Sequence, residues 1–531
     1  MMGRQVKDQQ QKLFYAGFSL DQRVRPDHPL RKIRALIDFD FTYQEVADRY
    51  GANGNVSVPP PVILKLMLLL VLYNVRSERE LMATIPERID WLWFLGLDLD
   101  DPIPDHSVLS KARTRWGSDT FKNFFERIVW QCVQAGLVDG SKIFMDSSLI
   151  RADASKNSVV MTKGLKRRLG QTYRQLESRL DDAPTGNEGK KVNDIYCSTT
   201  DPDAAIVRHK KEPAKPSYKA HRVVDGQSEI ITAAEVTRGD VNEGHMLPEL
   251  IEEHGQNTRI QAEVVVADSQ YGTAPNYLAC LDRGIDAHIP PKKKVPATGF
   301  FSEASFMYDP HDDTYLCPAG NRLKRRRYKK RDKAFEYACL GRLCRPCPLR
   351  DQCTTSKRGR TIQRHVRHDE VQRMRKKATE PAAKKDLRTR QHLMERSFAR
   401  AVRMGFKRAR WRRLWRVRIQ EYLTSAIQNI LILIRYVKEP GFAGAMALPA
   451  KQKSPQGGVH TSALINLIDY ARSFLLLFSR WSEPFQLISS RGEITPLFPE
   501  YFGQQPRIPR APCGLFLATL EMAPPLEGEE I

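Results

Sequence analysis

The segment from residue 142 to residue 291 constrains the fold most, because its hydrophobic pattern switches between the periods of strands and helices. Three β-rich runs come first, at 142–152, 218–226 and 229–239, and a Gly-containing turn joins the last two. A helix at 242–255 closed by Gly255, a buried strand at 262–272, a helix at 275–284 and a short strand at 285–291 follow. This order predicts a mixed β-sheet flanked by helices, in an α/β fold.

The region before this segment has a helical pattern. Residues 1–135 carry apolar side chains at three- and four-residue spacing. Pro59–Pro61 suits the start of one helix, and Ser77 with Glu80 forms a capping-box pattern at the start of another. Basic residues near Trp116 suggest an all-α region that binds DNA, although a helical scaffold with a solvated basic face explains them equally well.

After residue 291 the alternation of strands and helices stops, and a second helical stretch and a tail follow. Residues 291–385 hold five of the nine cysteines and the run RLKRRRYKKR (322–331), in which eight of ten residues are basic. Helical spacing resumes from 386 to 437. Residues 439–458 have the composition of a linker, and the rest of the tail stays unassigned. Within the sheet segment, residues 155–215 predict a long polar insertion with one helical piece near 160–180.

The charge balance indicates a polyanionic partner. The 531 residues include 85 Lys and Arg against 62 Asp and Glu, which favours nucleic acid first and an anionic membrane surface second. The longest apolar run, Val62–Tyr73, contains Lys65 and is too short to cross a bilayer. The N-terminus lacks the apolar core of a secretory signal. We therefore expect a cytoplasmic protein with reduced cysteines and no membrane partner.

Two acidic residues interrupt strands that are otherwise apolar. Asp146 lies inside IFMDSSLI, and Asp268 ends the strand in VVVADSQYG. Acids weaken strands and are costly to bury unpaired, so a shared cation is one explanation; a turn cap or an arginine partner is the alternative for each. Mg²⁺ (or Mn²⁺) takes carboxylate oxygens, and two such ions roughly 3.5–4 Å apart promote in-line phosphoryl displacement.

A third acid would come from the later helical stretch. Glu395 is the main candidate, and Glu421 is the weaker rival. Asp153 is a rival for Asp146, but it lies beyond the apolar strand, where a turn residue is the better interpretation.

Around these acids the chain resembles the DDE transposases of bacterial insertion sequences, and it looks closest to the insertion-sequence family numbered eleven eighty-two. Five blocks carry the resemblance in the order of that family. They are DSSLIRADAS, DPDA (201–204) with YKAH (218–221), ITAAEVTRGDVNEGHMLPELI, ADSQYGTAPN, and the helical stretch that begins ERSFARAVRMGF. Together they cover roughly residues 40 to 435.

The resemblance implies an RNase H-like core in which Asp146, Asp268 and Glu395 are the catalytic, metal-binding residues. It implies metal-dependent cleavage of DNA at the ends of the element, followed by attack of the freed 3′-OH on target DNA. The implied partners are double-stranded DNA (terminal inverted repeats and target) and further copies of the chain, associated with the bacterial nucleoid. An RNase H-like nuclease without strand transfer, and a catalytically inactive DNA-binding repressor derived from a transposase, are the alternative hypotheses.

One departure from the family concerns how DNA is held beside the site. Related transposases often carry Arg four residues before the Glu and Lys seven after it. This chain has Gln391 and Val402 there, with Arg390 and Arg403 one step away. His221, in YKAH, could line the site, but a structural role is favoured because most lone histidines have one.

The segment 403–418 combines basic and aromatic residues. RMGFKRARWRRLWRVR contains eight basic residues and no acid. On a continuous helix Trp411 and Trp415 would share a face, and the arginines at 408, 412 and 416 would form a stripe beside it. We predict that the aromatic side chains pack inward and that the arginines clamp DNA phosphates. The candidate DNA-binding residues are Lys407, Arg408, Arg412, Arg416, Arg403 and Arg390.

The cysteine cluster suggests a second metal. Cys344 and Cys347 form a CxxC pair, which is a common half-site for Zn²⁺. Cys317 and Cys353 could complete a four-thiolate site, with Cys339 as the alternative ligand. A structural zinc would help to fold a charged insertion that lacks a core of its own. Free thiols are the competing interpretation, because the spacing is irregular.

The expected architecture is therefore α/β: an RNase H-like mixed-sheet catalytic core with an all-α N-terminal domain and an inserted Cys-rich basic subdomain. The predicted divisions are a helical DNA-binding domain at 1–135, the first part of the catalytic core at 136–290, the Cys-rich basic insertion at 291–385, the rest of the core at 386–438, and a linker and tail at 439–531.

Overall fold

The computed structural model describes residues 19–51, 56–161, 192–208, 212–292, 300–356 and 358–436. All of them lie in one compact unit, Met1–Ala447. The predicted tail at 439–531 and nearly all of the helical piece expected near 160–180 fall outside the described residues.

The described residues before Lys142 form helices, as predicted. They are α1 (Leu20–Arg23), α2 (Pro29–Leu36), α3 (Phe41–Glu45), η1 (Ala47–Arg49), α4 (Pro60–Leu72), α5 (Glu78–Thr84), η2 (Ile85–Glu87), α6 (Ile89–Leu95), α7 (Ser107–Trp116) and α8 (Asp119–Gln134). Ser77 caps α5 as predicted, since its hydroxyl accepts a hydrogen bond from the backbone N–H of Glu80 at 3.1 Å. Helix α4 accounts for the longest apolar run: all but two of its side chains are buried. None of the helices in the described residues is both long and apolar enough to span a membrane.

The predicted order of strands and helices in the sheet segment is confirmed. The main sheet contains β1 (Lys142–Arg151), β4 (Ala205–Val207), β5 (Lys215–Asp225), β6 (Ile231–Arg238), β7 (Val264–Val266) and β8 (Asp286–His288). Its order is β4-β5-β1-β7-β8, with β6 also paired to β5. Strand β5 is antiparallel to both β1 and β6, whereas β7 is parallel to β1 and to β8, so the sheet is mixed.

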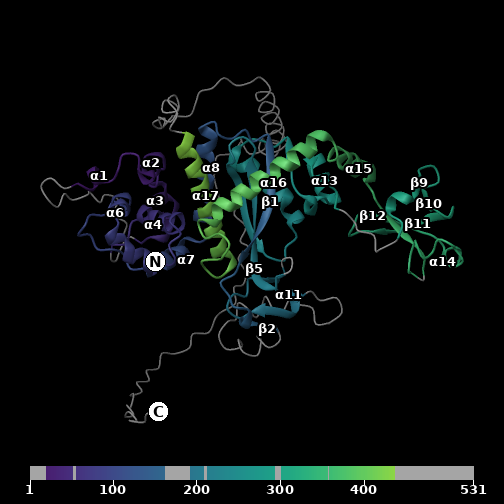
Figure 1. Cartoon of the computed structure of the whole chain (residues 1–531), viewed down its shortest axis with the longest axis horizontal. Coiled ribbons are helices and arrows are strands. Elements are labelled where there is room, and N and C mark those ends of the chain that lie inside the picture. Colours follow the sequence, from purple (N-terminus) through teal and green to yellow (C-terminus); the bar gives the residue numbers. More distant parts are fainter. Residues whose placement is uncertain are drawn as a thin grey trace, which may run out of the picture. The chain divides into compact units, whose positions relative to one another are not determined.

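Helices cover both faces of this sheet (Figure 1). They are η4 (Glu243–Met246), α12 (Leu247–Thr258), η5 (Ser269–Tyr271), α13 (Ala274–Leu281), α15 (His368–Lys377), α16 (Pro381–Val402) and α17 (Leu414–Tyr436). Helix α12 continues three residues past the predicted stop at Gly255, because Arg259, not the glycine, adopts the left-handed conformation that ends it. The polar insertion adds η3 (Lys156–Ser158), α11 (Val192–Ile195) and the small pair β2 (Val159–Met161) and β3 (Tyr196–Ser198).

Two hydrophobic cores hold these layers together. Helices α12, α13 and α15 bury one face of the sheet around Ile143 and Val265. The other face, with Phe144 and Val224, shares a larger core with α17 and with the N-terminal helices α4 and α8. Helix α17 has 16 buried residues, so it packs on nearly all sides. The N-terminal helices and the sheet are therefore joined through α17 in a single core.

A second sheet contains the cysteines. Its elements are η6 (Glu303–Ser305), β9 (Met307–Asp309), β10 (Thr314–Leu316), β11 (Arg322–Lys329), β12 (Ala334–Ala338), α14 (Gly341–Cys344) and β13 (Thr361–His365). The strands follow the order β13-β12-β11-β10-β9 and are all antiparallel. The basic run at 322–331 contains the whole of β11, a strand that could not be recognised in the sequence because so many of its residues are charged. We call residues 300–356 and 358–365 the cysteine module.

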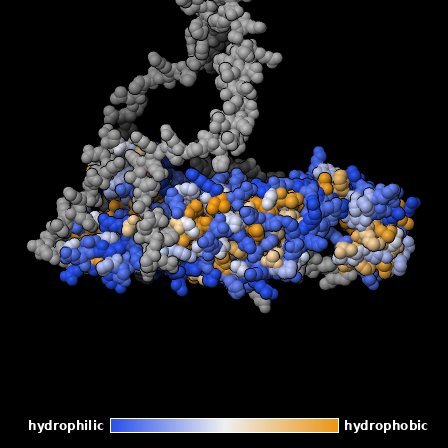
Figure 2. All heavy atoms as spheres, turned by 90° about the horizontal axis from the view of Figure 1, so that it is seen from above, coloured by the Kyte–Doolittle hydropathy of each residue, from blue (hydrophilic) through white to orange (hydrophobic). Residues whose placement is uncertain are grey.

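The surface is mainly polar. Figure 2 shows a largely hydrophilic face on which apolar side chains lie in separate groups. The large exposed apolar residues are likewise spread along the chain, from Val56 to Tyr436. Scattered apolar residues of this kind are normal for a globular surface.

Candidate active site

The register of the central strands brings the two predicted aspartates together. Lys142 of β1 lies opposite Val264 of β7, and Phe144 lies opposite Val266. Continuing this register by two residues places Asp146 beside Asp268, which follows the end of β7. Side chains two residues apart on a strand point to the same face, so both carboxylates come from equivalent positions on neighbouring parallel strands.

A third carboxylate joins them from η4. Ligand oxygens of Asp146, Glu243 and Asp268 all lie within 4.8 Å of one another, and no other such group of His, Cys, Asp or Glu occurs among the residues that the structure describes. Each of the three residues is half-buried. The acid at 243 was not among the sequence candidates, because NEGHM was interpreted only as the start of a helix.

Close packing of two turns positions Glu243. A Cβ on Gly244 would meet the carbonyl oxygen of Gln270 at 3.0 Å, so the glycine lets η4 approach η5. The buried Asn276 side chain donates to the carbonyl oxygens of both Gly244 and Tyr271, at 2.8 and 2.9 Å. One amide therefore ties the turn that carries Glu243 to the turn that follows Asp268.

Clustering and burial make these charges costly. Burial raises the pKa of Asp146 to about 6, an effect that Arg390 opposes and the nearby carboxylates reinforce. Burial likewise raises the pKa of Asp268, although the backbone N–H of Gln270 donates to its carboxylate at 2.8 Å. Three neighbouring carboxylates in such surroundings favour a bound cation.

An arginine supplies positive charge beside the three carboxylates. The Arg390 guanidinium lies 2.9 Å from the Asp146 carboxylate and also donates to the carbonyl oxygen of Met145. Its helix, α16, is anchored at Asp386, which accepts from Lys142 at 3.0 Å and lies 2.8 Å from the ring of His288. Arg390 was predicted to bind DNA; its present partner is a predicted catalytic carboxylate.

The donor set fits a hard divalent cation. All three groups are carboxylates, which is the chemistry that Mg²⁺ and Mn²⁺ prefer. Half-burial leaves the site open to substrate, as an ion that must also bind phosphate oxygens requires.

Neither candidate for the third acid belongs to this group. Glu395 is exposed on α16, where Gln391 donates to its carboxylate at 3.2 Å. Glu421 on α17 is fully buried in an ion pair with Arg222, with one N–O distance of 3.0 Å. Because an unpaired guanidinium could not be buried there, Glu421 has a structural role that explains its position without a metal.

The remaining sequence candidates near the site have structural partners. Asp153 binds Arg408 at 2.8 Å and Arg412 at 3.3 Å, in keeping with its interpretation as a residue outside the metal site. His221 is fully buried, and its Nε2 lies 2.9 Å from the Thr237 hydroxyl. Burial lowers the pKa of His221 to about 3, so the ring is neutral.

The prediction of a continuous basic helix at 403–418 is wrong. Helix α16 ends at Val402 and α17 begins at Leu414, so Trp411 and Trp415 do not share a helical face. Residues 403–413, which we call the connection, instead pair with β1. The Arg151 N–H donates to the Lys407 carbonyl, and the Ala409 N–H donates to the Arg151 carbonyl. Gly405 and Arg413 both have positive φ, which interrupts helical geometry.

The predicted DNA-binding residues now divide into two sets. Arg403, Lys407, Arg408 and Arg412 are exposed on the connection, and Arg416 is half-buried with its guanidinium 4.7 Å from the Trp415 ring. Arg390 instead lies in the acidic site. On the other side of the connection, the Trp411 indole N–H donates to Glu78, and Arg113 stacks on the same ring at 4.1 Å. Arg113 is therefore part of the core and not of the basic surface.

A polar groove runs beside the acidic site. It is bounded by Glu243 and by β1 residues from Ser147 to Arg151. Lys407 lies on its wall and donates to the Ser148 hydroxyl at 2.8 Å. Further basic residues line it at 151, 208, 215 and 219. A groove with this excess of positive charge suits a phosphate backbone.

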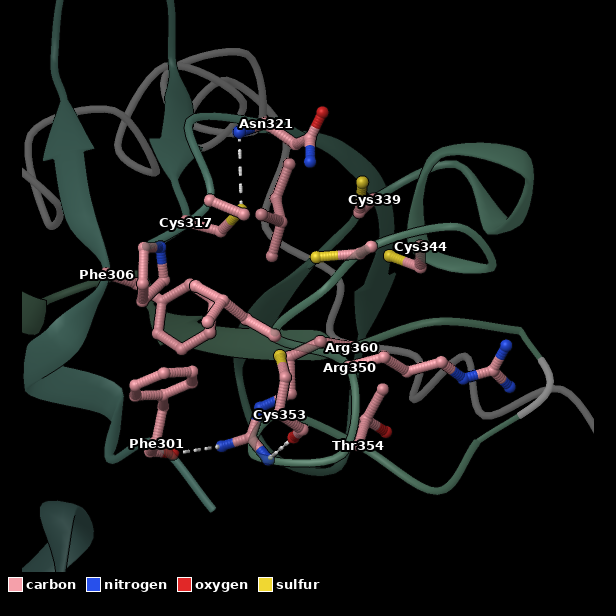
Figure 3. Close-up of a pocket in the computed structure, with 15 residues that line it drawn as sticks. Phe301, Phe306, Cys317, Asn321, Cys339, Cys344, Arg350, Cys353, Thr354 and Arg360 are labelled. Carbon is pink, nitrogen blue, oxygen red and sulfur yellow. Dashed lines mark hydrogen bonds between the residues drawn. The ribbon is translucent and has the colours of Figure 1, made fainter.

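The five cysteines of the module converge on one pocket. Cys317, Cys339, Cys344 and Cys353 surround it in Figure 3, and Cys347 also lines it. All five are free thiols. The convergence that the sequence suggested is therefore present in the fold.

Comparison with known proteins identifies two domains. Residues 18–115 match a family model described as Transposase domain (DUF772), and residues 316–434 match one described as Transposase DDE domain. Two separate stretches of the chain are thus similar to transposase domains. The second match includes Glu395 and the module cysteines, whereas Asp146 and Asp268 lie outside both.

Wider comparisons add little. No curated protein matches the chain significantly. A solved structure described as a piggyBac transposase synaptic complex with hairpin DNA is similar at 10% identity and a TM-score of 0.33, covering 79% of this chain and 78% of that one. A likeness at this level supports no conclusion.

Proposed function

We propose that this chain is the transposase of a bacterial insertion sequence, of the kind grouped in the family numbered eleven eighty-two. In this proposal it cuts DNA at the ends of the element and joins the freed 3′-OH to target DNA. The observation that carries the proposal is the group of Asp146, Glu243 and Asp268, which come from β1, from η4 and from the turn after β7. The two matches to transposase domains support DNA as the substrate.

The sheet order supports an RNase H-like core. Strands β6, β5 and β1 form an antiparallel series, and β7 and β8 continue it in parallel with β1. The first aspartate lies on the central strand and the second follows its parallel neighbour. Both aspartates lie at the carboxyl end of the parallel pairing between β1 and β7, and ligands commonly bind at the carboxyl ends of strands in open α/β sheets.

The residues of this chain prepare the site for a phosphodiester. Asp146 and Asp268 hold the divalent cations, and Glu243 adds a carboxylate from the side of the groove. When bound, Mg²⁺ or Mn²⁺ ions activate an oxygen nucleophile and stabilise the leaving oxygen of an in-line displacement. Arg390, which neutralises Asp146 in this structure, is released to contact the DNA phosphate. Lys407 and its basic neighbours orient the strand along the groove.

Glu395 is proposed as the catalytic glutamate. It lies within the matched DDE domain, on the same helix as Arg390. Its carboxylate lies outside the acid group in this structure, so in this proposal it enters the site by a movement of α16 that accompanies DNA binding. Glu243 then serves as a supporting ligand, and Glu395 acts only in the DNA-bound state. Two copies of the chain would bridge the two ends of the element.

The test is a cleavage and strand-transfer assay on a DNA duplex that carries the inverted repeats flanking the gene. With Mg²⁺, the wild type should nick the repeat end and join it to a target plasmid. Asp146→Asn and Asp268→Asn should each lose more than about 100-fold of the nicking rate while binding the duplex within about threefold of the wild-type affinity. Asp286→Asn is the matched control, since Asp286 lies on the neighbouring strand β8 outside the acid group.

Three outcomes would contradict the proposal. Nicking that survives both substitutions would move the active site elsewhere. Nicking without any joined product would leave a nuclease. Binding without nicking in the wild type would leave a DNA-binding repressor.

A further inference from the structure

The cysteine module has too small an apolar core for its size. Its core cluster contains only Phe306, Tyr315, Leu323, Tyr337, Cys339 and Ile362, with no long helix of the described module to cover them. Modules of this length commonly need a metal or disulfides, because a small core leaves little stability after the cost of ordering the chain. The five cysteines of the module are free thiols, so disulfides do not supply this stability.

Turn geometry around the pocket directs thiols inward. After β10, the Cys317 carbonyl accepts from the Gly320 N–H at 2.8 Å, and the Asn321 N–H donates to the Cys317 sulfur at 3.3 Å (Figure 3). A backbone N–H pointing at sulfur stabilises a thiolate, which is the form that binds metal. Gly320 has φ +78, a conformation that closes this tight turn at little cost.

The second half of the pocket comes from 344–353. Cys344 ends α14, and the N–H of Arg350 donates to the Cys347 carbonyl, while the N–H of Cys353 donates to the Arg350 carbonyl. The Arg360 guanidinium donates to the carbonyls of Cys353 and Phe301, which fixes this loop to the start of the module. Gly359, with φ +91, packs against the Cys344 sulfur, where a Cβ would stand 3.1 Å away.

Cys339 differs from the other four. It directly follows β12, is 1% exposed and belongs to the apolar core of the module. Cys317, Cys344, Cys347 and Cys353 are half-buried in loops or at the end of α14, where an ion can reach them from solvent.

We propose that Cys317, Cys344, Cys347 and Cys353 bind one structural Zn²⁺ ion as a closed four-thiolate site, with Cys339 packed behind it. The proposal is independent of the proposed activity at the acidic site. The four sulfurs do not yet form a group within 4.8 Å in the described residues, so they draw together on the ion, to Zn–S distances of about 2.3 Å. The ion thereby fastens the β10–β11 turn to the loop after α14, across the basic strand β11. Four thiolates leave no open position, so this zinc performs no catalysis.

The test measures zinc in the full-length protein, purified in metal-depleted buffer after growth with zinc. The wild type should hold about one zinc per chain. Serine substitution of Cys317, Cys344, Cys347 or Cys353 should lower this below about 0.2 per chain. Cys339→Ser and Cys197→Ser are the matched controls and should keep the full amount; Cys197 is a half-buried cysteine outside the module.

A second measurement, on the wild type, tests the proposal even if the serine variants fail to fold. Wild-type protein stripped of zinc and titrated with Co²⁺ should develop the strong visible absorption of tetrahedral thiolate coordination, saturating at one ion per chain. A wild type with less than about half an equivalent of zinc would overturn the proposal. So would loss of zinc in Cys339→Ser with retention in one of the four predicted ligand variants, or cobalt spectra without thiolate absorption.

Discussion

At the residue scale, Arg390 and Asp146 define the state of the acidic site. Their 2.9 Å ion pair places a guanidinium where a divalent cation would otherwise balance the carboxylates. The two glutamates beside it differ in what they should do. Glu243 is in the acid group before any DNA arrives, whereas Glu395 is exposed one and a half turns along α16 from Arg390.

Substitution of these glutamates should therefore give different kinetic defects. Glu243→Gln should raise the Mg²⁺ concentration for half-maximal nicking by about 10–100-fold, because a supporting ligand tunes affinity, and excess Mg²⁺ should restore the rate. Glu395→Gln should lower the nicking rate by more than about 100-fold at every Mg²⁺ concentration. Metal titrations of the nicking rate measure both. Full activity in Glu395→Gln with an inactive Glu243→Gln would instead make Glu243 the catalytic glutamate.

The buried His254 provides a pH-dependent contribution to stability. It lies on α12, its Nε2 donates to the Gly140 carbonyl at 3.1 Å, and its Nδ1 accepts from the Thr232 hydroxyl at 2.8 Å. Burial lowers its pKa from 6.5 to about 4. The unfolded chain therefore binds more protons than the folded chain between these values, so stability is lost as the pH falls through this window.

A neutral substitute removes this dependence. At about 1.4 kcal/mol per pKa unit, His254 accounts for roughly 3 kcal/mol of unfolding free energy between pH 6.5 and pH 4. The difference in unfolding free energy between the wild type and His254→Gln, measured by urea denaturation, should shrink by about that amount across this range. A difference that stays constant with pH would mean that the histidine is not held neutral in the folded protein.

At the element scale, the sequence predicts those helices and strands whose formation depends on local residue patterns. The β-branched runs around Asp146 and Asp268 form strands in the expected order, and Ser77 caps the helix that it was expected to begin. In contrast, β11 was missed because its charges conceal the alternation; only Leu323 of that strand is buried. The placement of Glu243 could not be predicted, since it depends on Asn276, 33 positions later, linking two separate turns.

The connection 403–413 shows why a strong helical pattern can fail. Its spacing of Arg and Trp fits a helix, but backbone hydrogen bonds to Arg151 of β1 outweigh local propensity. The break also needs the left-handed conformations of Gly405 and Arg413, and the sequence gives no signal for a left-handed arginine. The basic character of the connection was thus evident from the sequence, whereas the arrangement of its side chains was not.

Gly405 should be essential to this connection. It has φ +80, and a Cβ there would lie 2.5 Å from the Asn74 side-chain oxygen. Gly405→Ala should lower the unfolding free energy by about 1–3 kcal/mol, because it strains the backbone and separates the connection from the residues after α4. The control is Gly255→Ala, at a glycine inside α12. A Cβ there would have its nearest contact at 3.9 Å, with a carbonyl oxygen beyond the helix, so this substitution should be neutral or stabilising by roughly 0.5–1 kcal/mol. Equal effects of both substitutions would show that the turn is not constrained.

At the scale of the whole molecule, part of the positive charge lies where Lys407 of the connection meets the basic groove. Formal charge is +23, yet many arginines form ion pairs inside the structure, as Arg222 does with Glu421. Arg408 and Arg412 are different: their side chains are 75% and 53% exposed, and both share Asp153 as partner. Exposed ion pairs of this kind are weak, so a DNA phosphate can replace the aspartate.

Competition between Asp153 and DNA gives the last prediction. The double substitution Arg408→Ala with Arg412→Ala should weaken binding to any duplex and reduce the slope of log affinity against log salt by about two, one for each lost phosphate contact. Asp153→Asn should act in the opposite direction and tighten binding by severalfold at low salt, because it frees both guanidinium groups and removes a negative charge from the surface. Fluorescence anisotropy with labelled duplex over a range of salt concentrations measures both effects.

The control is Arg283→Ala, an exposed arginine after α13, on the opposite side of the sheet from α17. It removes one positive charge without touching the connection, so a loss of affinity equal to half that of the double variant would attribute binding to net charge alone.

If Asp153→Asn leaves the affinity unchanged while the double substitution weakens it, DNA contacts the arginines without displacing the aspartate. Only an unchanged salt slope in the double variant would place the DNA-binding surface outside the connection, because counterion release reports the number of phosphates contacted irrespective of DNA sequence.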